Sequence, residues 1–200
     1  MEYLFFDIEC ANCYTGRGKI YSFGYLLTDE NFVPLKGPCD ILMNPVSNFD
    51  PYVKKNILAY DRKMFKTLPK FNEIYPEICE LMCAKDRICF GYGILNDIHF
   101  LKDDCMRYSL PEIKAEIFDI QQLIEIIEDK KARKLDVEYS DRTTGEERLT
   151  HRSDEDAVRT AKIAQSLCAG KDKKLHEYFY EFFKEQNKTC KKKQVNTPVV

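Results

Sequence analysis

An unbroken apolar run that ends in two acids is the feature that most constrains how this chain can fold. Residues 3–6 are Tyr, Leu, Phe and Phe, and Asp7 and Glu9 follow with only Ile8 between them. Runs of large apolar residues without polar interruption are typical of strands that are buried on both faces. Such strands occur in α/β sheets covered by helices, where ligands bind beyond the carboxyl ends of the strands.

The two acids are expected to project side by side. Residues i and i+2 of a strand point to the same face, so Asp7 and Glu9 would lie roughly 7 Å apart at Cα. Two half-buried like charges are costly unless a cation lies between them, and carboxylate oxygens favour Mg²⁺ or Mn²⁺. A strand that simply ends and emerges into water is the alternative, and this segment alone does not decide between the two.

The rest of the chain alternates between strand and helix patterns. Two strands flank the turn-like residues 28–31, and then come a polar connection and a helix-strand alternation. Asn96 and Asp119 are candidate caps of two of the helices, and the polar residues 138–150 resemble a loop. This order predicts an α/β fold with a mixed sheet whose first three strands are antiparallel and whose later strands are parallel.

Size and composition favour one domain. The chain has 200 residues, and 44% of them are apolar. We expect a main domain over 1–170, an amphipathic helix over 171–188 and a basic, flexible tail over 189–200. Residues 171–200 contain eight lysines against four acids, whereas the preceding residues have a net charge of −6. The tail could follow a phosphate backbone, but a solvated helix and a mobile end explain it as simply.

Membrane and secretory signals are not seen. No stretch approaches the roughly 18 apolar residues of a membrane span, and the Met1 start lacks a secretory pattern, which predicts a cytoplasmic protein without a membrane partner. The nine cysteines are therefore expected to be reduced. The pair Cys10 and Cys13 has zinc-ligand spacing, but a second pair with such spacing is missing.

Two further segments contain candidate site residues. Asp97 follows a strand and a glycine turn, where an acid also interacts favourably with the helix dipole. The segment "THRSDEDAVRTA" contains His151, Asp154 and Asp156. A capping box of Ser153 with Asp156 would explain its polar character equally well. Spacing alone does not choose between Asp154 and Asp156.

Taken in order, these segments resemble the DEDDh family of 3′-to-5′ exonucleases, which includes proofreading subunits and RNase T-like enzymes on a ribonuclease H-like fold. The resemblance covers roughly residues 2–169. The first motif of the family, Asp-x-Glu after an apolar strand, matches Asp7 and Glu9. The second matches Asp97 with "IHFL", and the third matches His151 with the Asp156–Ala157 pair.

The resemblance implies hydrolysis of a terminal phosphodiester with two Mg²⁺ or Mn²⁺ ions. Asp7, Glu9 and Asp156 would hold the tighter ion, and Asp7 would bridge to a second ion with help from Asp97. His151 would be the general base, and the other histidines, His99 and His176, would be structural or exposed. The implied substrates are single-stranded DNA or RNA 3′ ends, with DNA slightly favoured.

The chain departs from the family at positions expected to contact substrate. "CAN" stands where Thr-Thr-Gly is common, Tyr92 and Gly93 stand where His-Asn is common, and Ser153 replaces a usual Ala. The candidate substrate contacts are Cys10, Ala11, Asn12, Tyr14, Tyr92 and Gly93. Either tyrosine could stack on a terminal base, although an ordinary packed tyrosine is an equal alternative.

Two alternative functions stay open. The chain could be an exoribonuclease that trims short RNA, or a non-catalytic nucleic-acid-binding module on the same fold, although binding alone has no need of His151. No polymerase or helicase region accompanies the domain, so a separate polymerase partner or a free-standing enzyme is expected. The amphipathic segment "LHEYFYEFF" could be the interface of a homodimer as easily as a packed helix.

Overall fold

The computed structural model describes the backbone of residues 1–12, 18–143 and 151–195, and side chains as far as residue 186. The strands are β1 (Glu2–Cys10), β2 (Ile20–Asp29), β3 (Pro34–Leu42), β4 (Arg87–Gly91) and β5 (Ile117–Asp119). The helices are α1 (Pro51–Asn56), the 3₁₀ helix η1 (Met64–Thr67), α2 (Phe71–Met82), α3 (Leu95–Arg107), α4 (Ile120–Glu128), α5 (Leu135–Arg142), α6 (Ser153–Cys168) and α7 (Leu175–Val195).

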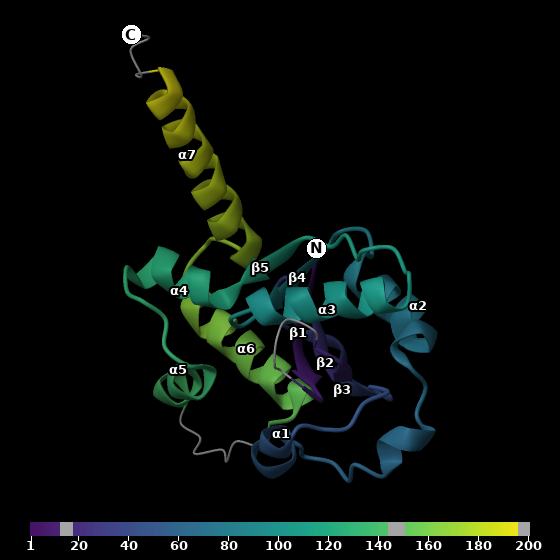
Figure 1. Ribbon diagram of the computed structural model, residues 1–200. Helices are drawn as coiled ribbons and strands as arrows, with labels where there is room; N and C mark the ends of the chain where they lie inside the picture. Colours follow the sequence, from purple (N-terminus) through teal and green to yellow (C-terminus); the bar gives the residue numbers. More distant parts are fainter. Residues whose placement is uncertain (13–17, 144–150, 196–200) are drawn as a thin grey trace.

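The strands form one mixed sheet in the order β3-β2-β1-β4-β5 (Figure 1). Strand β2 is antiparallel to both β1 and β3, while β4 is parallel to β1 and β5 is parallel to β4. The predicted fold class, antiparallel first and parallel later, is confirmed. The apolar run that opens the chain is the central strand, which explains why it has no polar face in its first half.

Helices cover both faces of the sheet and make three layers. Leu4, Phe6 and Ile8 of β1 pack on one face with residues of α2 and α3, such as Ile78 and Leu101. The alternate residues of β1 face the other layer. There Tyr3 and Phe5 pack with residues of α4, α6 and α7, among them Ile120, Ala157 and Phe179. Because side chains alternate along a strand, Asp7 and Glu9 must face the layer that contains α6.

Helix α5 and the short helices α1 and η1 correct the prediction of polar connections. Residues 138–142 were expected to form a loop, but they are the second half of α5. The reason is Glu138, which is fully buried and bonded to two arginines, so a polar sequence still packs. Residues 144–150, the rest of that predicted loop, lie outside the described residues.

Two of the candidate helix caps do not form, and one is confirmed. The N-cap of α3 is Ile94 rather than Asn96, and Ser153 lies inside α6 without a capping bond, so its proposed capping box does not form. Asp119 does cap α4, because its Oδ1 accepts a hydrogen bond from the Gln121 amide at 2.9 Å. The N-cap of α4 could therefore be recognised in the sequence from an acid that stands between a strand and a helix.

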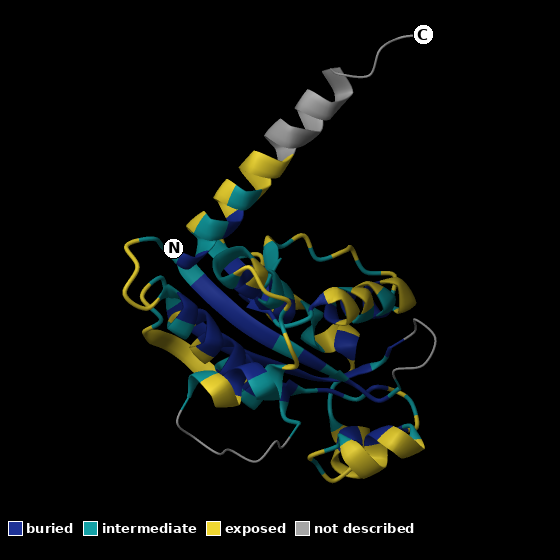
Figure 2. Ribbon diagram, turned by 90° about the vertical axis from the view of Figure 1, so that its left-hand side faces the viewer, coloured by how far each residue is buried: buried dark blue, intermediate teal, exposed yellow. Residues whose placement is uncertain are grey.

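Helix α7 projects away from the sheet, and much of the described part beyond its first turns is exposed (Figure 2). It continues through Val195, seven residues past the helix boundary expected at 188. Its first turns pack on the sheet: Phe118 of β5 stacks on Phe179 with ring centroids 4.6 Å apart. Among the helices of the described residues, none is both long enough and apolar enough to cross a membrane.

Candidate active site

Three carboxylates meet where strand β1 ends and helix α6 begins. Asp7 and Glu9 project from β1, and Asp156 lies in the first turn of α6. One carboxylate oxygen from each of the three lies within 4.8 Å of the others. Two elements separated by more than 140 residues thus supply one group of oxygen donors.

A glycine allows this approach. Gly24 of β2 pairs directly with Asp7 in the antiparallel ladder. A Cβ atom at Gly24 would lie 2.0 Å from the Asp154 backbone nitrogen and 2.0 Å from the Ser153 carbonyl carbon. The start of α6 therefore rests on the β2 backbone itself, and no other residue type fits between them.

A buried polar cluster links the start of α6 to the neighbouring strands β2 and β3. Ser22 Oγ donates to Asp40 Oδ1 at 2.6 Å, and Ser153 Oγ contacts both of these groups. The Tyr60 hydroxyl donates to the other Asp40 oxygen. Ser153, which departs from the resembled family, therefore ties α6 to strands β2 and β3 and contacts no solvent.

Asp97 lies beside this group rather than in it. It sits in the first turn of α3, is buried, and its carboxylate accepts a hydrogen bond from the Ile8 backbone amide between Asp7 and Glu9. Asp119 supports this end of α3, because it accepts hydrogen bonds from the amides of Gly93 at 2.9 Å and Ile94 at 3.2 Å. The sequence identified Asp119 only as a cap for α4.

The carboxylates raise one another's pKa values. Burial, followed by the nearby charges of Asp156 and Asp97, raises the pKa of Glu9 to about 8. Burial raises the pKa of Asp97 to about 7, against the lowering effect of its backbone hydrogen bonds. The pKa of Asp7 lies well above its ordinary value, first because of burial and then because of Asp97 and Glu9. Without bound cations, the group therefore binds protons near neutral pH.

Arg159 is a member of the site that sequence reasoning missed. Its Nη1 donates to Asp156 Oδ1 at 2.6 Å, and its side chain is 97% buried. Burial raises the pKa of the Asp156 carboxyl, and Arg159 partly offsets the rise. An arginine three residues after the acid on the same helix was the available signal.

His151 precedes α6, as predicted, and has a left-handed backbone with φ of 51°. A positive charge on its imidazole would lower the pKa of the Asp156 carboxyl, so the two side chains lie within electrostatic reach of each other. Asp154 instead pairs with Arg152, whose guanidinium lies over the Tyr60 ring. Between the two acids that spacing left open, only Asp156 joins the carboxylate group.

The predicted substrate contacts differ in where the structure places them. Cys10 and Ala11 are buried in the core, so their side chains are not exposed, and their contact with a substrate stays a prediction. Asn12 has a buried Oδ1 without a hydrogen-bond partner among the described residues. Tyr14 lies outside the described residues.

The second motif contributes structure at its first two positions. The Tyr92 hydroxyl donates to the carbonyl of Arg133, which precedes α5, at 2.6 Å, and the role of Tyr92 as a substrate contact stays a prediction. Gly93 has a φ of 68°, which favours glycine, and its amide donates to Asp119. Both positions set the path of the chain into α3.

The donor set fits a hard divalent cation. The group consists of carboxylate oxygens alone, and among the described residues Arg159 is the one cation that forms an ion pair with it. Three clustered carboxylates with one paired cation have negative charge left to neutralise, and Mg²⁺ and Mn²⁺ prefer such oxygen ligands. Asp7, Glu9 and Asp156 are the residues that would hold the ion.

Comparison with protein-family models and with curated protein sequences finds no match. Solved structures do match. The zinc-bound exonuclease I–ssDNA complex of E. coli aligns with a TM-score of 0.72 at 14% identity, over 90% of this chain and 43% of that chain. E. coli exonuclease I with a dA16 oligonucleotide aligns with a TM-score of 0.69 at 14% identity, over 92% and 43% of the two chains.

A further exonuclease I structure, described in terms of how processivity is achieved, aligns with a TM-score of 0.70 at 15% identity over 91% of this chain. The chain therefore has the exonuclease, ribonuclease H-like fold. It spans less than half the length of the exonuclease I chains that it matches.

Proposed function

We propose that this protein is a metal-dependent 3′-to-5′ exonuclease that removes nucleotides from single-stranded nucleic acid. The observation that supports this most directly is the group of Asp7, Glu9 and Asp156, whose oxygens lie within 4.8 Å of one another on a fold shared with exonuclease I. Complexes of exonuclease I with dA16 and dA13 oligonucleotides support a single-stranded DNA substrate, and we favour DNA slightly over RNA.

Each site residue has a proposed role. Asp7, Glu9 and Asp156 bind Mg²⁺ or Mn²⁺, and Asp97 helps with a second ion. Bound cations supply charge neutralisation at the phosphate and lower the pKa of a coordinated water. Arg159 orients Asp156 by occupying its Oδ1, which leaves Oδ2 for a ligand.

His151 is the proposed general base. It takes a proton from the attacking water while the water oxygen forms a bond to phosphorus, and the bond from phosphorus to the 3′ oxygen of the preceding nucleotide breaks. The left-handed backbone at His151 sets its side chain ahead of α6 rather than on the helix surface. The products are a 5′-mononucleotide and a strand shorter by one nucleotide.

The test is a gel assay with 5′-labelled single-stranded DNA and RNA of one sequence, with Mg²⁺, with Mn²⁺ and with EDTA. We expect a ladder that shortens from the 3′ end, that EDTA abolishes and that Asp7→Ala lacks. The matched control is Asp154→Ala, which removes an acid from the same turn as Asp156 but outside the carboxylate group. Loss of activity in Asp154→Ala with activity kept in Asp156→Ala would refute the assignment.

The same gel separates the alternatives. Faster shortening of RNA would favour the exoribonuclease that trims short RNA. Binding of both polymers without shortening under any metal condition would favour a non-catalytic module. Neither a homodimer nor a polymerase partner enters this proposal, because the three grouped carboxylates come from one chain.

A further inference from the structure

We propose that a basic cavity beside the carboxylate group binds backbone phosphates of the single-stranded nucleic acid, and this inference rests on the proposed function. The cavity, which we call the α1–η1 cavity, has a volume of about 340 Å³. Four cationic side chains line it, together with two aromatic rings at its base: Lys54, Arg62, Lys63, Lys66, Phe49 and Phe65.

The charge of this segment contrasts with the rest of the chain. Residues 44–70 contain six basic and two acidic residues, whereas the whole chain has a net charge of −2. The two acids, Asp50 and Asp61, accept hydrogen bonds from the backbone amides of Tyr52 and Lys63. The four cavity cations are exposed, and none forms an ion pair with another described residue. Their charge is therefore available to an anionic ligand.

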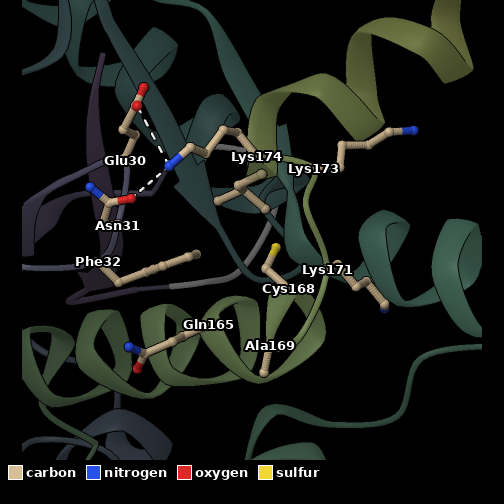
Figure 3. A pocket seen from close by; sticks show the side chains of 10 residues that line it. Glu30, Asn31, Phe32, Gln165, Cys168, Ala169, Lys171, Lys173 and Lys174 are labelled. Atoms are coloured by element: carbon tan, nitrogen blue, oxygen red, sulfur yellow. Dashed lines mark hydrogen bonds and ion pairs between the residues drawn. The ribbon is translucent and has the colours of Figure 1, made fainter.

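A second lysine-rich cavity differs from the first because its lysines are paired within the protein. It has a volume of about 300 Å³ and lies between α6, the start of α7 and the β2–β3 turn (Figure 3). There Lys174 bonds to Asn31 at 2.6 Å and pairs with Glu30, Lys173 pairs with Glu181, and Lys171 bonds to the Leu167 carbonyl. These lysines already have partners within the protein, so we assign no anion to this cavity.

The α1–η1 cavity adjoins the carboxylate group through a single aromatic ring. Phe49 and Phe65 contact the buried Tyr21 ring at centroid distances of 5.2 and 5.3 Å, and they also contact each other at 5.2 Å. The Tyr21 hydroxyl has its pKa raised by burial and, next, by the charge of Glu9, which places it near that carboxylate. Figure 1 shows α1 at the end of the sheet where α6 begins.

The chain after Glu9 also joins the two regions. The Ala11 carbonyl accepts a hydrogen bond from the Asp50 amide at 2.8 Å, and Ala11 packs against Phe49 and Phe65. On the same rim, Lys19 Nζ lies 3.4 Å from the Val46 carbonyl. The cavity is thus fixed to the residues that follow the carboxylate strand.

Charge explains why such a cavity suits this protein. The carboxylate group repels the phosphates of a strand whose 3′ end it must hold, and bound cations neutralise that repulsion only locally. Lysine and arginine side chains in an open cavity bind phosphates without reading the base sequence. The α1–η1 cavity therefore supplies sequence-independent affinity for nucleotides that lie beyond the terminal one.

The test compares two double variants that remove the same charge from the same segment. Lys54→Ala/Lys66→Ala removes two cavity lysines, and Lys55→Ala/Lys70→Ala removes two exposed lysines outside the cavity. Binding of a long 5′-labelled single strand is measured by fluorescence anisotropy in EDTA, with the salt concentration varied. Hydrolysis of the same strand and of a dinucleotide is measured with Mg²⁺.

We expect the cavity variant to bind the long strand roughly tenfold more weakly and its salt slope to fall by about 0.7 for each lost phosphate contact. Its kcat/KM should fall for the long strand and stay unchanged for the dinucleotide, while the control variant matches wild type. Equal losses in both double variants would overturn the proposal. Inorganic phosphate that displaces the strand at millimolar concentration would overturn it too, in favour of a small-anion site.

The anisotropy measurement separates this inference from the proposed function. If no polymer is hydrolysed but the cavity variant still binds more weakly than the control, the exonuclease proposal fails and the phosphate site stands. If hydrolysis is normal and both variants bind like wild type, the phosphate site fails alone. A circular dichroism spectrum of each variant checks that the fold is intact.

Discussion

Glu138 and the acids of the carboxylate group differ in what neutralises their charge. Glu138 of α5 is fully buried, and both of its oxygens bond to arginines: Arg133 at 2.9 Å and Arg142 at 2.9 Å. Asp7 and Glu9, in contrast, lie beside further carboxylates, and the arginine in their group bonds to Asp156 instead. One group contains its own cations, and the other needs cations from outside.

The pKa directions follow from this difference. Burial alone would raise the pKa of Glu138, but the bonds from Arg133 and Arg142 hold it below its ordinary value. The pKa of Glu9 is raised to about 8, because burial and neighbouring acids act in the same direction. An acid that stabilises the fold is compensated within the protein, whereas an acid that binds a metal is left uncompensated.

The largest expected effect comes from removing one uncompensated acid. We expect Asp7→Asn to lower kcat/KM on single-stranded DNA by a factor on the order of 10³ or more, because the cation loses a ligand. The same change should leave the unfolding free energy in EDTA unchanged or higher, since a buried charge among like charges is removed. Steady-state kinetics and urea unfolding check this. A large loss of stability would contradict the statement that the charge of Asp7 is uncompensated within the protein.

Removing the compensated acid should have the opposite profile. We expect Glu138→Gln to cost about 2–3 kcal/mol of unfolding free energy, because Arg142 and Arg133 lose their buried counter-charge. Activity per folded molecule should stay close to wild type. The measurement is urea unfolding, with Asp141→Asn as the control, since Asp141 is exposed and bonds to Arg133 alone. Equal destabilisation by both would contradict the role given to burial.

Metal and pH should affect the two groups differently. A group whose pKa is raised in the folded state stabilises the protein below its unfolded pKa, and that contribution is lost as pH rises through the folded pKa. For Glu9 the window runs from about 4.5 to about 8, so stability in EDTA should fall across it. The Glu138 group has the opposite sign and changes only in acid.

Saturating Mg²⁺ or Mn²⁺ should restore about 2.7 kcal/mol at a hundredfold excess over Kd, and more at higher pH as protons leave the carboxylates. Thermal unfolding with and without EDTA at several pH values measures this. The same shift in Asp7→Asn as in wild type would show that the metal binds elsewhere.

The smallest expected effect concerns the polar cluster that holds α6. Ser153→Ala removes its contacts with Ser22 and Asp40 and should cost about 1 kcal/mol of unfolding free energy. Activity should fall only severalfold, because Asp156 keeps its bond to Arg159. Ser140→Ala, at an exposed position of α5, is the control in the same urea measurement. Equal unfolding free energies of the two serine variants would show that the polar cluster does not stabilise the start of α6.

The parts of the fold that the sequence predicted depend on local patterns. The central strand, the β2–β3 pair and the Asp119 cap each follow from residues that are neighbours in the chain. The grouping of Asp7 and Glu9 follows from strand alternation, while the choice of Asp97 and Asp156 depended on a resemblance between motifs. The roles of these residues in catalysis stay predictions.

The parts that were missed depend on long-range contacts. Ser22 meets Ser153 across 131 positions, and no periodicity reports such a contact. Helix α5 was missed because its buried residue is charged, and its arginine partners could not be located from the sequence. Arg159 was overlooked because it lies on a helix face that also contains alanines of the core.

The absent side chain of Gly24 has a consequence for how this protein can vary. Helix α6 rests directly on β2 at the point where Gly24 faces Asp7, so one backbone-to-backbone contact sets the separation of the carboxylates. A methyl group added there would act as a spacer: it would lift the whole helix and widen the gap that an ion must bridge. All four acids could then be intact in the sequence while the site itself was lost. The separation of the carboxylates thus depends on a residue that has no side chain.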